Sequence, residues 1–210
     1  MIAAAVPRSD ASAAPAVAAF DFDGTLTRHD TMWLFLRHAF GRARLWAGVA
    51  LCAPWLAAYA VGLLDGGSAK QRLLSHFLRG MSGDRFGRLA ADFGATYASR
   101  EIKPKARAAL SRHLAAGHRV VVVTASVRQW VEPFVSEWPG VSVVATELAV
   151  DAAGRLTGRL GTPNCRGEEK WRRLTALIPD LAERRLIAYG DSAGDRALLA
   201  RAHEPHYRDL

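Results

Sequence analysis

Three short apolar runs each end in a polar segment. They occupy residues 17–22, 119–123 and 185–189. Continuous apolar runs of this length are typical of strands that are buried on both faces of a parallel sheet. Helical patterns lie between and after the runs, at residues 104–116, 127–137, 167–178 and 194–202. The alternation predicts an α/β fold with a mainly parallel sheet.

Two other segments depart from this alternation. Residues 143–160 contain short extended stretches separated by Gly154 and Gly158, and they predict a small β-hairpin beside the sheet. Residues 30–100 show no strand pattern, only helix-favouring stretches that are interrupted by Pro54 and by glycines. This second segment is expected to form a helical cap inserted into the α/β core.

These patterns divide the chain into three parts. Residues 1–15 are rich in Ala, Ser and Pro and have no apolar periodicity, so we expect a disordered tail there. Residues 16–29 and 101–210 form the predicted core, and residues 30–100 form the predicted cap. A chain of 210 residues is long enough for one core with such an insertion.

The cap contains a charge-free apolar run, residues 45–64, which is long enough to span a bilayer. A single crossing would put the carboxylates described below on opposite sides of the membrane, although their chemistry requires one site. Two interpretations remain open. The run is a buried helical hairpin bent at Pro54, or a hairpin whose apolar face contacts the lipid interface beside Trp46, Trp55, Arg42 and Arg44.

Charge and cysteine content narrow the function classes. The net charge is +8, but the arginines are scattered through the helical patterns, so we expect no nucleic-acid binding. An anionic substrate or membrane surface explains the charge equally well. Cys52 and Cys165 are far apart and form no CxxC pair, which argues against a zinc site and a disulfide framework. We expect a cytoplasmic location. Residues 45–64 suggest, in addition, peripheral contact with the inner face of the membrane.

The candidate chemistry begins where the first apolar run ends. The sequence Phe-Asp-Phe-Asp-Gly-Thr places Asp21 and Asp23 at the carboxyl end of a strand, where open α/β sheets bind their ligands. Two such aspartates alone can form a turn that caps the next helix. Followed by Gly24 and Thr25 after an apolar strand, they resemble the first motif of the haloacid dehalogenase superfamily. The resemblance covers residues 17–207.

The other motifs of that superfamily have counterparts here in the same order. Thr124 ends the second apolar run, Lys170 stands in Gly-Glu-Glu-Lys, and Asp191 follows Gly190, with Asp195 four residues later. Arg166 is the alternative to Lys170, because phosphoserine-phosphatase-like members carry the third-motif Lys directly before Gly-Glu.

The resemblance implies a Rossmann-like, doubly wound sheet with a C1-type cap, and a Mg²⁺-dependent phosphatase. In this mechanism Asp21 attacks the phosphorus to form an aspartyl-phosphate, and Asp23 protonates the leaving oxygen and then activates water. Thr124 and Lys170 bind phosphoryl oxygens and offset the charge of the transition state. The metal is held by the hard oxygens that Mg²⁺ prefers. The implied metal-site residues are Asp21, Asp23 (through its backbone carbonyl), Asp191 and Asp195.

The position of the cap resembles subfamily IB, which includes phosphoserine phosphatase and the bacterial phosphatidylglycerophosphatase C type. Asp30 stands where phosphoserine phosphatases carry a Glu that contacts the substrate's amino group, and it is equally suited to be a helix N-cap. The apolar cap favours an amphiphilic substrate, although Lys70, Arg72 and Arg79 can meet an anion. The predicted substrate-binding residues are Asp30, Ser126, Arg72 and Arg166.

We therefore expect a phosphomonoester hydrolase, with a lipid phosphate such as phosphatidylglycerophosphate ahead of a small soluble ester. Phosphoserine phosphatase is the alternative within the same class. A non-catalytic membrane- or partner-binding protein on this fold is the alternative from another class, and the presence of all the acidic residues needed for turnover argues against it.

Overall fold

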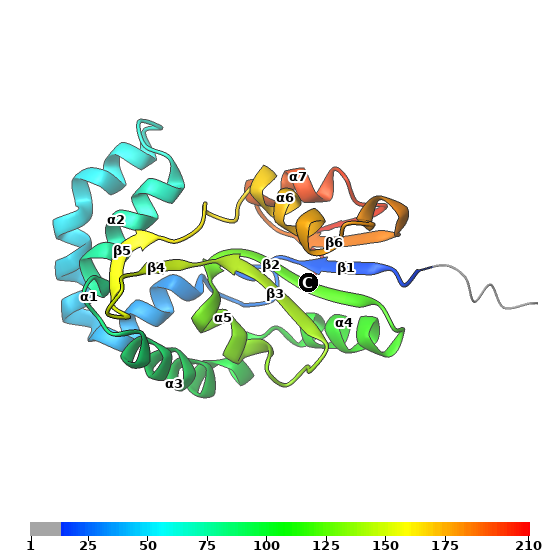
Figure 1. Ribbon diagram of the computed structural model, residues 1–210, viewed down its shortest axis with the longest axis horizontal. Helices are drawn as coiled ribbons and strands as arrows, with labels where there is room; N and C mark the ends of the chain where they lie inside the picture. The colour runs from blue at the N-terminus through cyan, green and yellow to red at the C-terminus, as the bar shows by residue number, and fades with distance from the viewer. Residues whose placement is uncertain (1–13) are drawn as a thin grey trace, which may run out of the picture.

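The computed structural model describes residues 14–210, so the first 13 residues of the expected tail lie outside the described part of the chain. Its centre is a parallel sheet in the order β3-β2-β1-β6-β7 (Figure 1). The strands are β1 (Val17–Phe20), β2 (Arg119–Val127), β3 (Val141–Thr146), β6 (Leu186–Gly190) and β7 (Glu204–Tyr207). This order, with β1 in the middle, confirms the predicted doubly wound α/β fold.

Helices cover both faces of the sheet, because successive strand residues point to opposite sides. Phe20 and Val122 pack toward one face, and Ala19 and Val121 pack toward the other. The first face carries α4 (Pro104–Ala115) and α5 (Arg128–Val135), below the sheet in Figure 1. The second carries α6 (Glu168–Leu177), η1 (Leu181–Glu183), η2 (Ala193–Asp195) and α7 (Arg196–Leu199).

Three helices and a hairpin form the end of the molecule at the left of Figure 1. The helices are α1 (Thr31–Ala60), α2 (Gly66–Leu78) and α3 (Gly83–Glu101), which we call the cap. The antiparallel hairpin of β4 (Leu148–Val150) and β5 (Leu156–Leu160) packs on α2. The predicted hairpin over residues 143–160 is thus correct only for its second part, since residues 143–146 belong to the parallel sheet as β3.

The helical backbone of α1 is interrupted at Gly41 and stays helical through Pro54. Gly41 has a φ of 76° and a ψ of 165°, which only glycine adopts without strain. Pro54 lies inside the helix and is exposed, so water can bind the carbonyl of Ala50 that it leaves without a helical donor. The chain reverses after α1, where Gly62 has a φ of 78°. The expected hairpin bent at Pro54 is therefore wrong, because the backbone stays helical past Pro54 as far as Ala60 and its interruption lies at Gly41.

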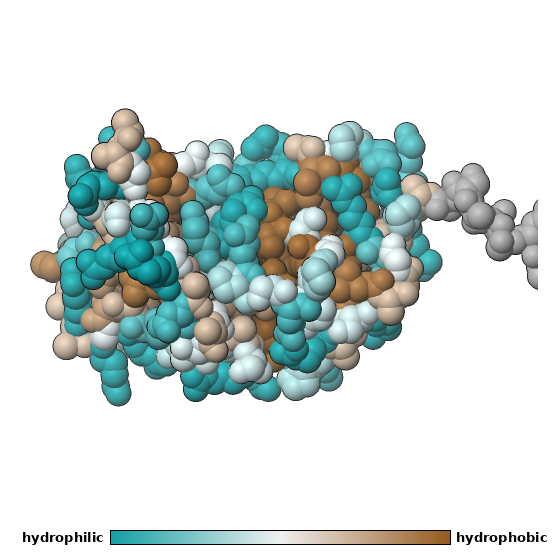
Figure 2. Space-filling view, turned by 60° about the horizontal axis from the view of Figure 1, so that its bottom comes forward, coloured by the Kyte–Doolittle hydropathy of each residue, from teal (hydrophilic) through white to brown (hydrophobic). Residues whose placement is uncertain are grey.

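The second half of α1 is buried on one side only. Gly48 packs so closely on α2 that a Cβ there would lie 2.3 Å from the ring of Phe77. The opposite side exposes large apolar residues, and Trp46 and Leu51 each keep 64% of their surface accessible. Figure 2 shows hydrophobic residues at the surface of this end of the molecule beside hydrophilic ones. No helix in residues 14–210 has the length and apolar character to cross a membrane.

Candidate active site

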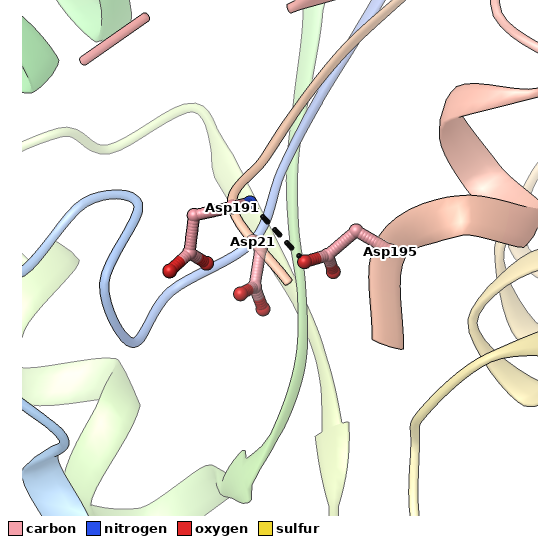
Figure 3. Close-up of side chains that lie close together, drawn as sticks. All are labelled: Asp21, Asp191 and Asp195. Carbon is pink, nitrogen blue, oxygen red and sulfur yellow. Dashed lines mark hydrogen bonds between the residues drawn. The ribbon is translucent and has the colours of Figure 1, made fainter. Parts of the chain in front are cut away.

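The carboxyl ends of the central strands bring three aspartates together. Asp21 follows β1, while Asp191 and Asp195 follow the neighbouring strand β6. One carboxylate oxygen of each lies within 4.8 Å of the others. Figure 3 shows the three side chains converging from the two strand ends. The cluster lies where the strand order reverses about β1, the usual ligand site of a doubly wound sheet.

Lys170, in the first turn of α6, reaches this cluster from the second helical layer. Its Nζ donates to Asp21 Oδ1 at 2.5 Å and to Asp195 Oδ1 at 2.6 Å, and its side chain is 2% exposed. Arg166 contacts none of the three aspartates and lines the adjacent cavity described below. The geometry therefore favours Lys170 over Arg166 for the third-motif position.

The cluster has too little positive charge for its carboxylates. Burial raises the pKa of Asp21 to about 7, although Lys170 opposes this shift. Burial also acts to raise the pKa of Asp195, but Lys170 outweighs it and the pKa is lowered. For Lys170, burial alone would lower the pKa, and the two carboxylates raise it instead. The one ammonium thus bonds to two of the three carboxylates, and the three together are a set of hard oxygen donors that fits Mg²⁺.

Backbone and hydroxyl groups fix the orientation of Asp191 and Asp195, the two aspartates that follow β6. Asp195 Oδ2 accepts hydrogen bonds from the backbone N–H groups of Asp191 (3.2 Å) and Ser192 (2.9 Å). Thr25 Oγ1 donates to Asp191 Oδ1 at 3.1 Å. Gly24 has a φ of 78°, and a Cβ there would lie 2.3 Å from Asp191 Oδ2. The Gly-Thr pair of the first motif therefore lets the two loops meet, a role for Thr25 that the sequence reasoning missed.

Asp23 turns away from the cluster, toward the first residue of the cap. Its Oδ1 accepts from the backbone N–H (2.7 Å) and the hydroxyl (2.6 Å) of Thr31, and its Oδ2 accepts from the Ser126 hydroxyl. Thr124 is buried at the neighbouring strand end, where its Oγ1 accepts from the backbone N–H of Ser126. Asp23 is thus held between the cluster and the cap, and no sequence motif had indicated its contact with Thr31.

A cavity of about 270 Å³ lies beside Asp23, between core and cap. Its polar lining combines residues of both parts, Asp23, Asp30, Lys70, Ser126, Asn164 and Arg166. Its apolar lining comes from the cap, chiefly Met32, Trp33, Leu56, Tyr59 and Leu73. The cavity therefore combines charged groups of core and cap with an apolar wall from the cap.

Two of the predicted substrate-binding residues, Asp30 and Arg72, make contacts that the sequence did not indicate. Asp30 lines the cavity and also caps α1, accepting the N–H of Met32 at 2.9 Å; burial and then Asp23 raise its pKa. Arg72 lies outside the cavity, with its guanidinium over the Trp55 ring, 5.5 Å from the centroid. Lys70 lines the cavity instead and donates to the carbonyl of Ala125. Residues two apart on a helix face different ways, so Lys70 replaces Arg72 at this site.

Comparison with known proteins identifies the family. Residues 18–200 match the family model of haloacid dehalogenase-like hydrolases. The chain belongs to this family. The hydrolase is also 36% identical to the protein CicA of Caulobacter vibrioides over 195 residues, which cover 92% of this chain and 86% of CicA.

Solved structures share the fold of this hydrolase. A protein of unknown function from Bordetella pertussis Tohama I has a TM-score of 0.77 at 23% identity, with 91% of this chain and 89% of that chain covered. A phosphoserine phosphatase, solved as a phospho-aspartyl intermediate analogue, has a TM-score of 0.61 at 18% identity, with 90% and 83% covered. At these identities the likeness concerns the fold.

Proposed function

We propose that this hydrolase is a Mg²⁺-dependent phosphomonoesterase that forms an aspartyl-phosphate on Asp21. The observation that carries the proposal is the buried Asp21 carboxylate, which shares Lys170 with Asp195 and lies within 4.8 Å of Asp191. Family membership supports hydrolysis. The phosphoserine phosphatase of similar fold, solved as a phospho-aspartyl intermediate analogue, supports the covalent route.

The proposed roles follow from these contacts. Asp21 attacks phosphorus, and Lys170 offsets charge on the phosphoryl oxygens together with Thr124. Asp23 gives a proton to the leaving oxygen and later takes one from water, while Thr31 and Ser126 hold its carboxyl in place. Asp21, Asp191, Asp195 and the backbone carbonyl of Asp23 would hold Mg²⁺, which when bound neutralises charge between the nucleophile and the phosphate.

A lipid phosphate is the proposed substrate, because most of the cap wall of the cavity is apolar. Tyr59 lines the cavity and is 42% exposed, so the cavity opens beside an exposed apolar residue of the same half of α1 that exposes Leu51. A substrate's chains can lie along this wall while its phosphate reaches Asp21. Phosphoserine remains the second candidate, since the charged groups of Asp30, Lys70 and Arg166 line the same cavity and suit a zwitterion.

We also propose that the exposed face of α1 contacts membrane lipid. Residues 45–64 carry no charge, and Trp46, Leu51, Val61 and Leu63 each expose more than half of their surface. Exposed arginines precede this stretch at Arg37, Arg42 and Arg44. An apolar face beside basic side chains is typical of helices that lie in the interface of an anionic membrane. We propose that the inserted segment 30–100, which contains nearly all of the cap helices, delivers the substrate to the core, residues 16–29 and 101–210.

A substrate panel tests the function. Purified protein is assayed against p-nitrophenyl phosphate, phosphoserine and phosphatidylglycerophosphate, with Mg²⁺ and with EDTA. We expect Mg²⁺-dependent hydrolysis of all three, highest kcat/KM for the lipid phosphate, and recovery when Mg²⁺ replaces EDTA. Absence of hydrolysis in every arm contradicts the proposal and favours a non-catalytic binding protein, whereas a preference for phosphoserine changes only the substrate.

A further inference from the structure

A second pocket, of about 420 Å³, lies between α2 and β5, apart from the cavity beside Asp23. Three exposed arginines line it: Arg72 of α2, Arg79 at the C-cap of α2 and Arg159 of β5. No lining residue of this pocket is shared with the active-site cavity. The pocket is therefore a separate feature that the proposed phosphatase chemistry does not use.

The backbone holds these arginines around one hollow. Arg72 and Arg79 are seven residues apart, two helical turns, so they project from the same face of α2 about 10 Å from each other. Gly158 has a φ of 82°, and a Cβ there would lie 2.4 Å from Ser75 Oγ, so β5 approaches α2 more closely than a larger residue permits. This contact brings Gly158 and the neighbouring Arg159 close to α2, and all three arginines line the pocket.

Additional polar groups line the same hollow. The hydroxyl groups of Ser75 and Thr157 are part of its lining. The side-chain oxygen of Gln71 accepts the N–H of Leu160 at 2.9 Å, which leaves its amide N–H₂ as a donor. Hydroxyl and amide donors beside guanidinium groups are the usual partners of phosphate oxygens.

The charge of the pocket is unbalanced. No Asp or Glu lines it, and within residues 14–210 none of the three guanidinium groups makes an ion pair or a hydrogen bond. By contrast, Arg172 and Arg173 on α6 both pair with Glu169. Like charges that converge without a counter-ion repel one another, and a bound anion removes this cost. Arginine binds phosphate through paired N–H groups, so phosphate is the anion that this arrangement fits best.

We propose that Arg72, Arg79 and Arg159 form a phosphate-binding site distinct from the active site, and that the phosphate belongs to the headgroup of an anionic lipid. The choice of a lipid rests on the proposed membrane contact. Arg72 lies over the ring of Trp55, which is 39% exposed and lies one helical turn after Leu51, which is 64% exposed. The phosphate pocket thus adjoins the apolar face, as a headgroup site beside an interfacial helix requires.

Two double variants with equal loss of charge test the site. Arg79→Gln/Arg159→Gln removes two pocket arginines and keeps the Arg72–Trp55 contact. Arg85→Gln/Arg88→Gln removes two exposed arginines of α3 and is the matched control. Vesicle binding of each variant is measured by flotation with phosphatidylcholine vesicles that contain phosphatidylglycerol. Phosphatidylglycerol is a phosphodiester and therefore no substrate for a monoesterase. Each variant is also measured by the rise in melting temperature that inorganic phosphate produces.

Vesicle binding should fall by about tenfold or more in the pocket variant and by about twofold in the control. The rise in melting temperature that phosphate produces should be smaller only in the pocket variant. Both should hydrolyse p-nitrophenyl phosphate like the wild type, which separates this site from the proposed function. If the phosphate-induced rise in melting temperature falls in the pocket variant but neither the wild type nor the variants bind vesicles, the phosphate site is supported and its ligand is a soluble phosphate. Equal responses of the two variants in both assays overturn the proposal.

Discussion

Lys170 is the residue whose replacement tests the electrostatics of the site most sharply. Lys170→Met keeps most of the side-chain volume but removes an ammonium that lies 2.5 Å from Asp21 and 2.6 Å from Asp195. Removing one partner of a buried ion pair leaves an uncompensated charge and costs about 3–5 kcal/mol. The metal-free variant should therefore lose about that much unfolding free energy. Its kcat should fall by about 10²- to 10³-fold, as is typical when one transition-state donor is lost.

Urea unfolding in metal-free buffer at about pH 8 measures the stability, and p-nitrophenyl phosphate hydrolysis with Mg²⁺ measures kcat. Mg²⁺ should return part of the lost stability, because a cation again faces the carboxylates. Arg166→Met is the matched control, since Arg166 contacts no carboxylate of the cluster, and it should cost less than about 1 kcal/mol. A loss below about 1 kcal/mol for Lys170→Met, or a larger fall in kcat for Arg166→Met, refutes the reasoning.

Three further predictions concern the acid–base residue, the metal and the cap. Asp23→Asn should lower kcat about 10²- to 10⁴-fold for an alkyl phosphate and less for p-nitrophenyl phosphate, whose leaving group needs no proton; equal losses for both esters count against general acid catalysis. Because burial raises the pKa of Asp21 from 3.8 to about 7, its ionisation destabilises the metal-free fold increasingly as the pH rises through that interval. Mg²⁺ should therefore raise the melting temperature more at about pH 8 than at about pH 5, and an equal or reversed effect would show that Asp21 is not its ligand. Trp46→Ser/Leu51→Ser should abolish vesicle flotation and leave the melting temperature and soluble-ester hydrolysis unchanged, because both side chains are mostly exposed; a much lower melting temperature, or no flotation of the wild type, contradicts a lipid-facing α1.

The sequence predicted best what short local patterns encode. The three apolar runs correspond to β1, β2 and β6, and the motifs that follow them converge because parallel strands end at the same edge of a sheet. The edge strands were harder to predict. Strand β7, Glu-Pro-His-Tyr, has no apolar run, and β3 is only half-buried, so both owe their conformation to pairing with a central strand.

The cap shows why helix orientation escapes a single sequence. Lys70 and Arg72 both lie on α2, and only packing against the core decides which one faces the active-site cavity. Pro54 was the obvious candidate for a bend, but an exposed proline can remain in a helix, whereas Gly41 adopts a backbone conformation that no side chain favours. The choice between Lys70 and Arg72 thus depends on contacts between distant segments.

The most direct measurement of the central claim is chemical identification of the phosphorylated residue during turnover. The wild type is mixed with a phosphomonoester and Mg²⁺, quenched in acid within the first turnovers, digested and analysed by mass spectrometry, with Asp21→Asn as the control. The proposal predicts a phosphoryl group on Asp21 in the wild type, and neither label nor hydrolysis in a folded Asp21→Asn protein. A phosphoryl group on another residue, or steady-state hydrolysis by Asp21→Asn, would contradict it.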